Sequence, residues 1–159
     1  MFWISECFPN EFIVSRHSIK DDRVWWLCFT AEETGSTISM TKGSYAPDVS
    51  LLTSTDEGET WNEFVSGSTT ITLANVGDKV YFKAGENGNK GFCSTGGTSD
   101  MLCNRFKMNG KISASGSIMS LLNGAYHTTE LQQKNTFVRL FQYCSALTKT
   151  PTLPATILT

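Results

Sequence analysis

Residues 55–84 read TDEGETWNEFVSGSTTITLANVGDKVYFKA and decide the fold class, because they place strand-like runs and tight turns within a short span. The clearest run is 79–84, where inward and outward side chains alternate. We expect its buried face to consist of Val80, Phe82 and Ala84. We expect its exposed face to consist of Lys79, Tyr81 and Lys83. This alternation is typical of an antiparallel sheet with one buried face.

The run 54–61, STDEGETW, predicts a tight hairpin turn. Asp56 can accept backbone N–H hydrogen bonds across the turn, and Gly58 can adopt a positive φ without a clash at Cβ. The spacing resembles the Asp-box, a hairpin motif that recurs in sialidases and other propeller proteins. The matching residues are Ser54, Asp56, Gly58, Thr60 and Trp61. The resemblance implies a structural turn without a catalytic role.

The rest of the sequence does not fit a sialidase. A propeller needs several blade motifs along a longer chain, whereas this sequence of 159 residues contains one Asp-box. A sialidase site also needs clustered arginines to hold the substrate carboxylate. The arginines of this chain show no recognisable site spacing: Arg16, Arg23, Arg105 and Arg139.

Alternating runs continue on both sides of the central stretch. Upstream, 27–31 and 36–41 predict a hairpin. Downstream, 104–109 and 111–114 flank Asn109-Gly110, a favoured two-residue hairpin turn. The sequence therefore predicts a mainly β fold, an antiparallel β-sandwich of the Ig-like or jelly-roll-like type.

The hydrophobic period changes near the C-terminus. Phe137, Leu140, Phe141 and Cys144 recur at helical spacing and predict a short helix, followed by an extended tail from Pro151. We divide the chain into an atypical lead-in (1–26), a sandwich domain (27–123) and a helix with its tail (124–159).

Charge and hydropathy exclude some classes of protein. The net charge of −2 and the pI of about 5.7 argue against nucleic-acid binding, which needs a basic surface. Charged residues make up 18% of the chain, and this low share suits an extracellular β domain. Residues 1–8 lack the basic start of a signal peptide, and no apolar run is long enough to span a membrane.

The cysteines predict neither a metal site nor a cofactor, because no pair has zinc-site spacing. Cys93 and Cys103 flank a loop rich in Gly, Ser and Thr. They either close this loop as a disulfide or remain two partly buried thiols, and the spacing leaves both alternatives open. Cys28 and Cys144 lie among apolar neighbours and are expected in the core.

Several phrases together resemble the β-rich segment that precedes leucine-rich repeats in BspA-like bacterial surface proteins. They are LCFTAEE (27–33), the Asp-box turn, TITLANVGDKVYFK (70–83) and MNGKISASGSIMSLL (108–122). The tail 137–158 is similar to one repeat unit of the form F-x-x-C-x-x-L-x-x-x-P-x-L-P-A. A solenoid needs about three units, so this unit either begins a longer array or caps the sheet domain.

The resemblance implies a non-catalytic extracellular interaction or adhesion module at a bacterial cell surface. Its partner would be a glycan or a protein on a host or bacterial surface. We expect the binding surface on the glycine-rich loop 85–98 or on exposed aromatic residues such as Tyr45 and Tyr81.

Two other functions are retained as alternatives, a glycoside hydrolase-related domain and a phage structural or decoration domain. Hydrolysis needs two carboxylates at a defined separation. The acids here are crowded on separate turns, such as Asp56, Glu57 and Glu59 on the Asp-box turn. His17 and His127 stand alone in the sequence. We therefore predict no catalytic residue.

Overall fold

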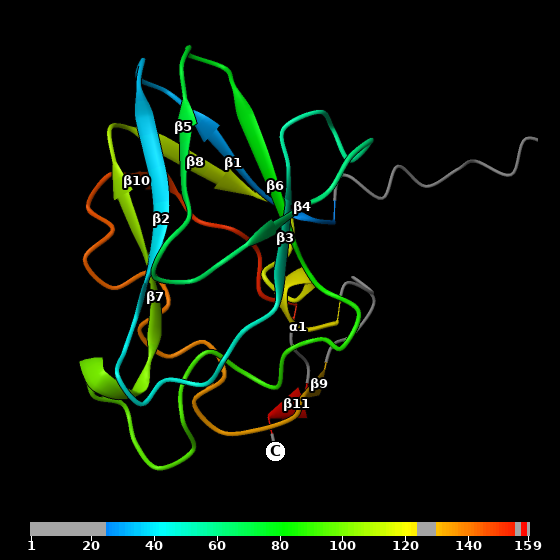
Figure 1. Ribbon diagram of the computed structural model, residues 1–159, viewed down its shortest axis with the longest axis vertical. Coiled ribbons are helices and arrows are strands. Elements are labelled where there is room, and N and C mark those ends of the chain that lie inside the picture. The colour runs from blue at the N-terminus through cyan, green and yellow to red at the C-terminus, as the bar shows by residue number, and fades with distance from the viewer. Residues whose placement is uncertain (1–24, 124–129, 155–156, 159) are drawn as a thin grey trace, which may run out of the picture.

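The computed structural model describes residues 25–123, 130–154 and 157–158 (Figure 1). The helical segments in this part are short: the 3₁₀ segment η2 (Asp100–Leu102) and helix α1 (Ser120–Asn123). The strands are β1 (Leu27–Ala31), β2 (Ser36–Lys42), β3 (Leu51–Ser54), β4 (Asn62–Phe64), β5 (Thr70–Leu73), β6 (Lys79–Ala84), β7 (Asn104–Asn109), β8 (Ile112–Ser115), β9 (Glu130–Leu131), β10 (Leu147–Lys149) and β11 (Ile157–Leu158). The prediction of a mainly β protein is confirmed.

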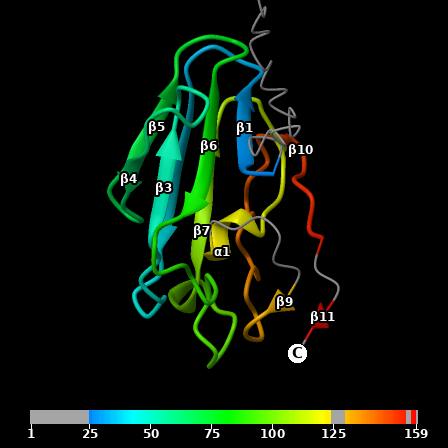
Figure 2. The same ribbon diagram turned by 90° about the vertical axis from the view of Figure 1, so that its right-hand side faces the viewer.

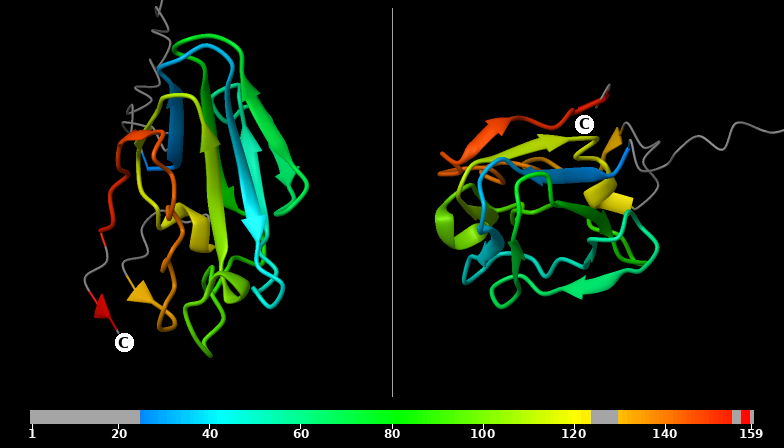
Figure 3. Two further views of the ribbon diagram at one scale, coloured as in Figure 1. Left: turned by 90° about the vertical axis from the view of Figure 1, so that its left-hand side faces the viewer. Right: turned by 90° about the horizontal axis from the view of Figure 1, so that it is seen from above.

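Two sheets enclose the core (Figures 2 and 3). The larger sheet has the strand order β10-β8-β1-β6-β3-β4, and the smaller sheet has the order β5-β2-β7. Neighbouring strands are antiparallel except for β10, which is parallel to β8. Phe106 of β7 packs against Phe29 of β1 and Phe82 of β6, with ring centroids 5.2 and 5.4 Å apart. The core therefore lies between the two sheets.

Period-two alternation correctly predicts most of the buried side chains. Phe82 is fully buried on the inward face expected for 79–84, and Phe29, Ile38 and Ile112 are fully buried at alternating positions of the runs expected as strands. Each large apolar side chain removed from water contributes roughly 1.5–3 kcal/mol. Rings from both sheets meet edge to face, a geometry that adds specificity to the packing.

The prediction that Tyr81 is exposed is wrong, because its side chain is only 6% exposed. Tyr81 does lie on the outward face of β6, between the inward-facing Val80 and Phe82. The Trp26 ring packs edge-on against it, with centroids 6.2 Å apart. A side chain from just before β1 therefore covers this part of the sheet.

The helix predicted around 137–144 is also wrong. Residues 134–143 form successive turns, with positive φ at Asn135, Arg139 and Tyr143. Hydrogen bonds link residues three apart, such as Val138 N to Asn135 O and Gln142 N to Arg139 O. The apolar side chains of this segment still pack on the core because each turn returns one of them to the same side.

The C-terminal segment runs along one side of the two sheets (Figures 2 and 3). Besides β10, which pairs with β8, the residue Thr152 forms a parallel bridge with Ser117. β11 then pairs in parallel with β9, so the chain returns beside the start of this segment. In the described residues, no helix has the length and apolar character needed to cross a membrane.

Candidate functional site

The structure brings the five Asp-box residues together in one turn. Asp56 accepts hydrogen bonds from the Ser54 hydroxyl at 2.6 Å and from the Thr60 backbone N–H at 2.9 Å. The backbone N–H of Gly58 donates to Ser54 Oγ at 2.8 Å. The bonds from Ser54 and Thr60 lower the pKa of Asp56 from 3.8 to about 2. This carboxylate is thus an acceptor that holds the turn closed.

Aromatic rings and one lysine join the Asp-box turn to the larger sheet. Trp26 meets Trp61 edge to face at 4.9 Å between ring centroids. Lys83 Nζ lies 3.9 Å from the centroid of the Trp61 ring, and burial lowers the pKa of this lysine. The sequence does not indicate this role of Trp26, because residues 1–26 have no hydrophobic period. These contacts anchor the turn on the larger sheet, and the two indole rings pack on each other.

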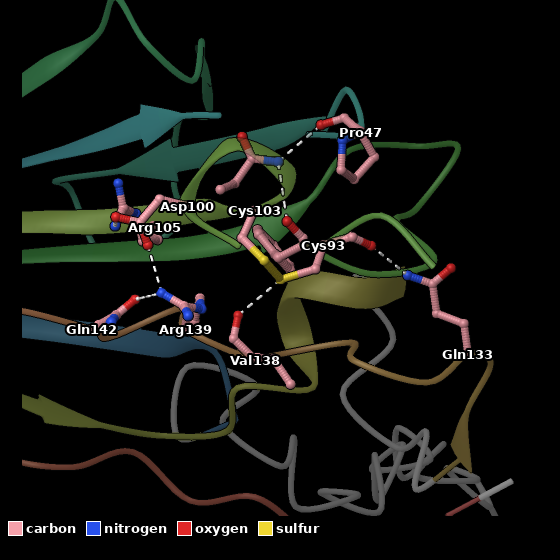
Figure 4. Close-up of a disulfide and its surroundings, with 11 residues drawn as sticks. Pro47, Cys93, Asp100, Cys103, Arg105, Gln133, Val138, Arg139 and Gln142 are labelled. Atoms are coloured by element: carbon pink, nitrogen blue, oxygen red, sulfur yellow. Dashed lines mark hydrogen bonds and ion pairs between the residues drawn. A yellow bond between two sulfur atoms is a disulfide. The ribbon is translucent and has the colours of Figure 1, made fainter. Parts of the chain in front are cut away.

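Cys93 and Cys103 form a disulfide, which resolves the alternatives left open by the sequence (Figure 4). The two residues face each other in an antiparallel bridge. Hydrogen bonds from Ser94 N to Leu102 O and from Asn104 N to Phe92 O flank the bridge. Cys93 Sγ also lies 3.0 Å from the carbonyl oxygen of Val138, in the C-terminal turns. The disulfide therefore fixes the loop that contains η2 to the start of β7.

Asp100, within the disulfide loop, holds two arginines that are distant in sequence (Figure 4). Its carboxylate oxygens lie 2.8 Å from Arg105 Nη1 and 2.5 Å from Arg139 Nη1. Arg139 also donates to Gln142 Oε1 at 2.8 Å. The Arg105 guanidinium lies 5.7 Å from the centroid of the Tyr143 ring. These contacts join β7, the disulfide loop and the C-terminal turns into one polar cluster.

The outer face of the smaller sheet carries hydroxyl groups and cations. Ser39 in β2 pairs with Thr70 of β5 on one side and with Lys107 of β7 on the other. Thr41 pairs with Arg105 one step along the same face. This face is directed away from the core because the alternate residues Ile38, Met40 and Phe106 are buried.

Two hollows adjoin here, one on this outer face and one between β7 and the C-terminal turns, and together we call them the Lys107 groove. One hollow, of about 310 Å³, includes Ser39 and Thr70 in its wall. The other, of about 260 Å³, includes Arg105 and Tyr143. Thr41 and Lys107 line both hollows. In the described part of the chain, no carboxylate lines either hollow. The wall of the groove therefore combines hydroxyl groups, cations and one tyrosine with the apolar residues Met40, Phe106 and Met108.

The surfaces expected from the sequence lie elsewhere. Tyr45 is 68% exposed, and the glycine-rich loop lines a separate hollow of about 440 Å³ with Asn87, Lys90 and Ser94 in its wall. The sequence did not indicate the Lys107 groove, because its wall comes from four separate segments. The hydroxyl side chains at the outward positions of an alternating strand are the one sequence signal that could have indicated a wall of the groove.

The acids do not converge on one cleft in the described residues. Asp56 closes its own turn, Glu32 accepts a hydrogen bond from the Thr148 hydroxyl at 2.9 Å, and Glu33 accepts one from Lys111 N at 3.1 Å. Over the same residues, no group of three His, Cys, Asp or Glu side chains could hold a metal ion. His17, His127, Arg16 and Arg23 lie outside the described residues.

Comparison with known protein families, curated proteins and solved structures finds no match to this chain. The class of the protein is therefore given by the structure itself, which is mainly β with two sheets around a common core.

Proposed function

We propose that this chain is a non-catalytic interaction module at a bacterial cell surface, binding a glycan or a protein through the Lys107 groove. One observation carries the proposal. The outer face of β5-β2-β7 and the adjoining C-terminal turns combine exposed hydroxyls, cations and a 76% exposed Tyr143 around two hollows. Binding sites commonly place a few polar groups and an aromatic ring on a preformed surface.

The disulfide supports the extracellular location in this proposal. Disulfides persist in oxidising compartments and are rare in reducing ones. Cys93–Cys103 links the loop of Asp100 to β7, so it also stabilises the arginines beside the groove. In the same proposal, the two sheets form an Ig-like or jelly-roll-like sandwich, and 137–158 is one leucine-rich-repeat unit of the BspA-like type.

A glycoside hydrolase function has less support. Hydrolysis needs two carboxylates that face the same sugar. Asp56 is bound within its turn, while Glu32 bonds to Thr148 of β10 and Glu33 bonds to Lys111 just before β8. The groove wall has hydroxyls and cations suited to holding a ligand, and none of the described residues that line it is an acid that could protonate a leaving group.

A pair of matched variants tests the binding module. Thr70 and Thr72 are both exposed threonines on the outward face of β5, but only Thr70 lines the groove. We expect Thr70→Trp to fill the hollow and reduce binding of the fluorescently labelled chain to glycan arrays, surface-protein arrays or whole cells. Thr72→Trp should leave binding unchanged.

The same assay includes outcomes that contradict the proposal. Absence of binding to any array or cell would refute an interaction module. Equal losses for Thr70→Trp and Thr72→Trp would refute the groove as its site. Release of free sugar from the glycans would instead indicate an enzyme.

A further inference from the structure

The Lys107 groove lies within a locally basic region of an acidic chain. Lys42, Arg105 and Lys107 line it. Arg139 lies just behind the wall, where it donates to Gln142. The carboxylates paired with these cations belong to Asp48 and Asp100. The whole chain, in contrast, has a net charge of −2. Cations therefore outnumber acids at this one place, although the overall composition gives the opposite balance.

Lys107 is the cation best placed to meet a ligand. It is exposed on β7 and lines both hollows. Among the described residues, no carboxylate lies within ion-pair distance of its ammonium group, whereas Arg105 is paired at 2.8 Å. A ligand anion at Lys107 would consequently not have to displace a protein carboxylate.

The other walls of the groove suit a sugar. Ser39, Thr41 and Thr70 supply hydroxyls, which can both donate and accept hydrogen bonds. Tyr143 supplies an exposed ring with a hydroxyl group at its tip, and rigid tyrosines give large contact areas at a low entropic cost. Two adjoining hollows also suit an extended ligand better than a compact one.

We propose that the Lys107 groove binds an acidic glycan, with Lys107 holding its sulfate or carboxylate and Tyr143 stacking against a sugar ring. The inference rests on the proposed function and adds the class of ligand. A protein partner is less favoured, because protein interfaces depend on buried apolar anchors and the hollow beside Thr70 is lined mainly by small polar residues. A polynucleotide shares the negative charge and is an outcome of the test.

The test measures binding of the full chain to four probes by calorimetry. They are a heparan sulfate oligosaccharide, a hyaluronate oligosaccharide, a neutral chitin oligosaccharide and single-stranded DNA. We expect the acidic glycans to bind, with affinity falling between about 50 mM and about 300 mM NaCl as salt screens the charges. Comparison of heparan sulfate with hyaluronate distinguishes a sulfate site from a carboxylate site.

Variants with matched controls locate the site. Lys107→Glu should weaken binding about tenfold or more, equivalent to about 1.4 kcal/mol, and Lys107→Arg should retain it. Lys79→Glu reverses the charge of an exposed strand lysine on the larger sheet and should have no more than a twofold effect. Tyr143→Ala should weaken binding about fivefold, while Tyr45→Ala, which removes an equally prominent tyrosine, should not.

Each remaining outcome overturns a stated part of the inference. Equal binding of the neutral probe, or equal losses for Lys107→Glu and Lys79→Glu, would refute an acidic-glycan site while leaving the interaction module standing. Tighter binding of the DNA would assign the groove to a polynucleotide. If no probe, array or cell binds the chain, the proposed function itself fails.

Discussion

The Nζ atom of Lys83 lies 3.9 Å from the centroid of the Trp61 ring, so strand β6 is in direct contact with the Asp-box turn. Trp26 packs edge-on against the same indole at 4.9 Å between centroids. A cation–π contact of this kind contributes about 0.5–1 kcal/mol at an exposed site. The turn is therefore stabilised by its own hydrogen bonds and by packing from two other segments.

The first prediction concerns Gly58, which has φ +92° and lies beneath Trp26. A Cβ atom at this position would lie 2.5 Å from Trp26 Cζ3. We expect Gly58→Ala to lower the free energy of unfolding by about 2–3 kcal/mol in urea denaturation, from backbone strain and displacement of the indole.

Gly77→Ala is the matched control for this prediction. Gly77 has nearly the same φ, +93°, but an added Cβ would meet no atom within 4 Å. Its cost should be about 1 kcal/mol, from backbone strain alone. Equal losses at the two glycines would show that Trp26 does not pack on the turn.

The second prediction uses the lowered pKa of Asp56. Because Ser54 and Thr60 bond to its ionised form, the pKa is 3.8 in the unfolded chain and about 2 in the folded protein. The resulting stabilisation is present above pH 3.8 and is lost as the pH falls from 3.8 to about 2. We expect the melting temperature to fall across this window, and Asp56→Asn should lack that part of the decrease.

Glu59→Gln removes the same charge from the same turn and is the control. It should leave the pH profile of the melting temperature close to that of the unmodified chain, because the bonds to Asp56 remain. An Asp56→Asn profile parallel to that of the unmodified chain between pH 2 and 3.8 would contradict the role of this carboxylate.

Period-two alternation predicts the inward positions of β1, β2, β6 and β7 because a sheet buries every second side chain. It predicts the wrong environment for Tyr81, because Trp26 covers this side chain. Trp26 lies in a segment that has no hydrophobic period. The rule reports which face a side chain occupies. It does not report what packs on that face.

The helix predicted from the spacing of apolar residues in 137–144 is wrong for a related reason. Successive turns, with positive φ at Arg139 and Tyr143, also return a side chain to the same face every three or four residues. The Lys107 groove is harder still to predict. Thr41, Lys107 and Tyr143 are far apart in sequence, and each resembles an ordinary exposed residue. The β2–β7 register brings the first two together, and the C-terminal turns bring Tyr143 beside them.

The third prediction concerns the two buried free thiols. Burial raises the pKa of Cys144 from 9.0 to about 11 and also raises that of Cys28. Cys144 donates to the Phe106 carbonyl oxygen at 3.1 Å. We expect iodoacetamide to modify both thiols in the native protein at pH 8 at least about tenfold more slowly than in urea, because alkylation requires an exposed thiolate. Mass spectrometry of tryptic peptides measures both rates, and native-state labelling at the denatured rate would place these thiols at the surface.

The last prediction concerns the disulfide between Cys93 and Cys103, which are separated by 10 positions in the sequence. Closing a loop of this size reduces the entropy of the unfolded chain, so we expect Cys93→Ser/Cys103→Ser to lower the free energy of unfolding by about 2–3 kcal/mol. The larger effect should be local. Asp100 lies inside the loop and holds both Arg105 and Arg139, so hydrogen exchange should rise in 94–102 and 138–143.

Dithiothreitol provides the control for the double variant. The reductant should destabilise the unmodified chain by a similar amount and leave the double variant unchanged. Peptide mapping without reductant should recover Cys93 and Cys103 as one linked pair, while Cys28 and Cys144 are alkylated after unfolding. Recovery of all four as free thiols would contradict the bond. It would also remove the disulfide's support for an oxidising location. Asp100 would then be held by its ion pairs alone.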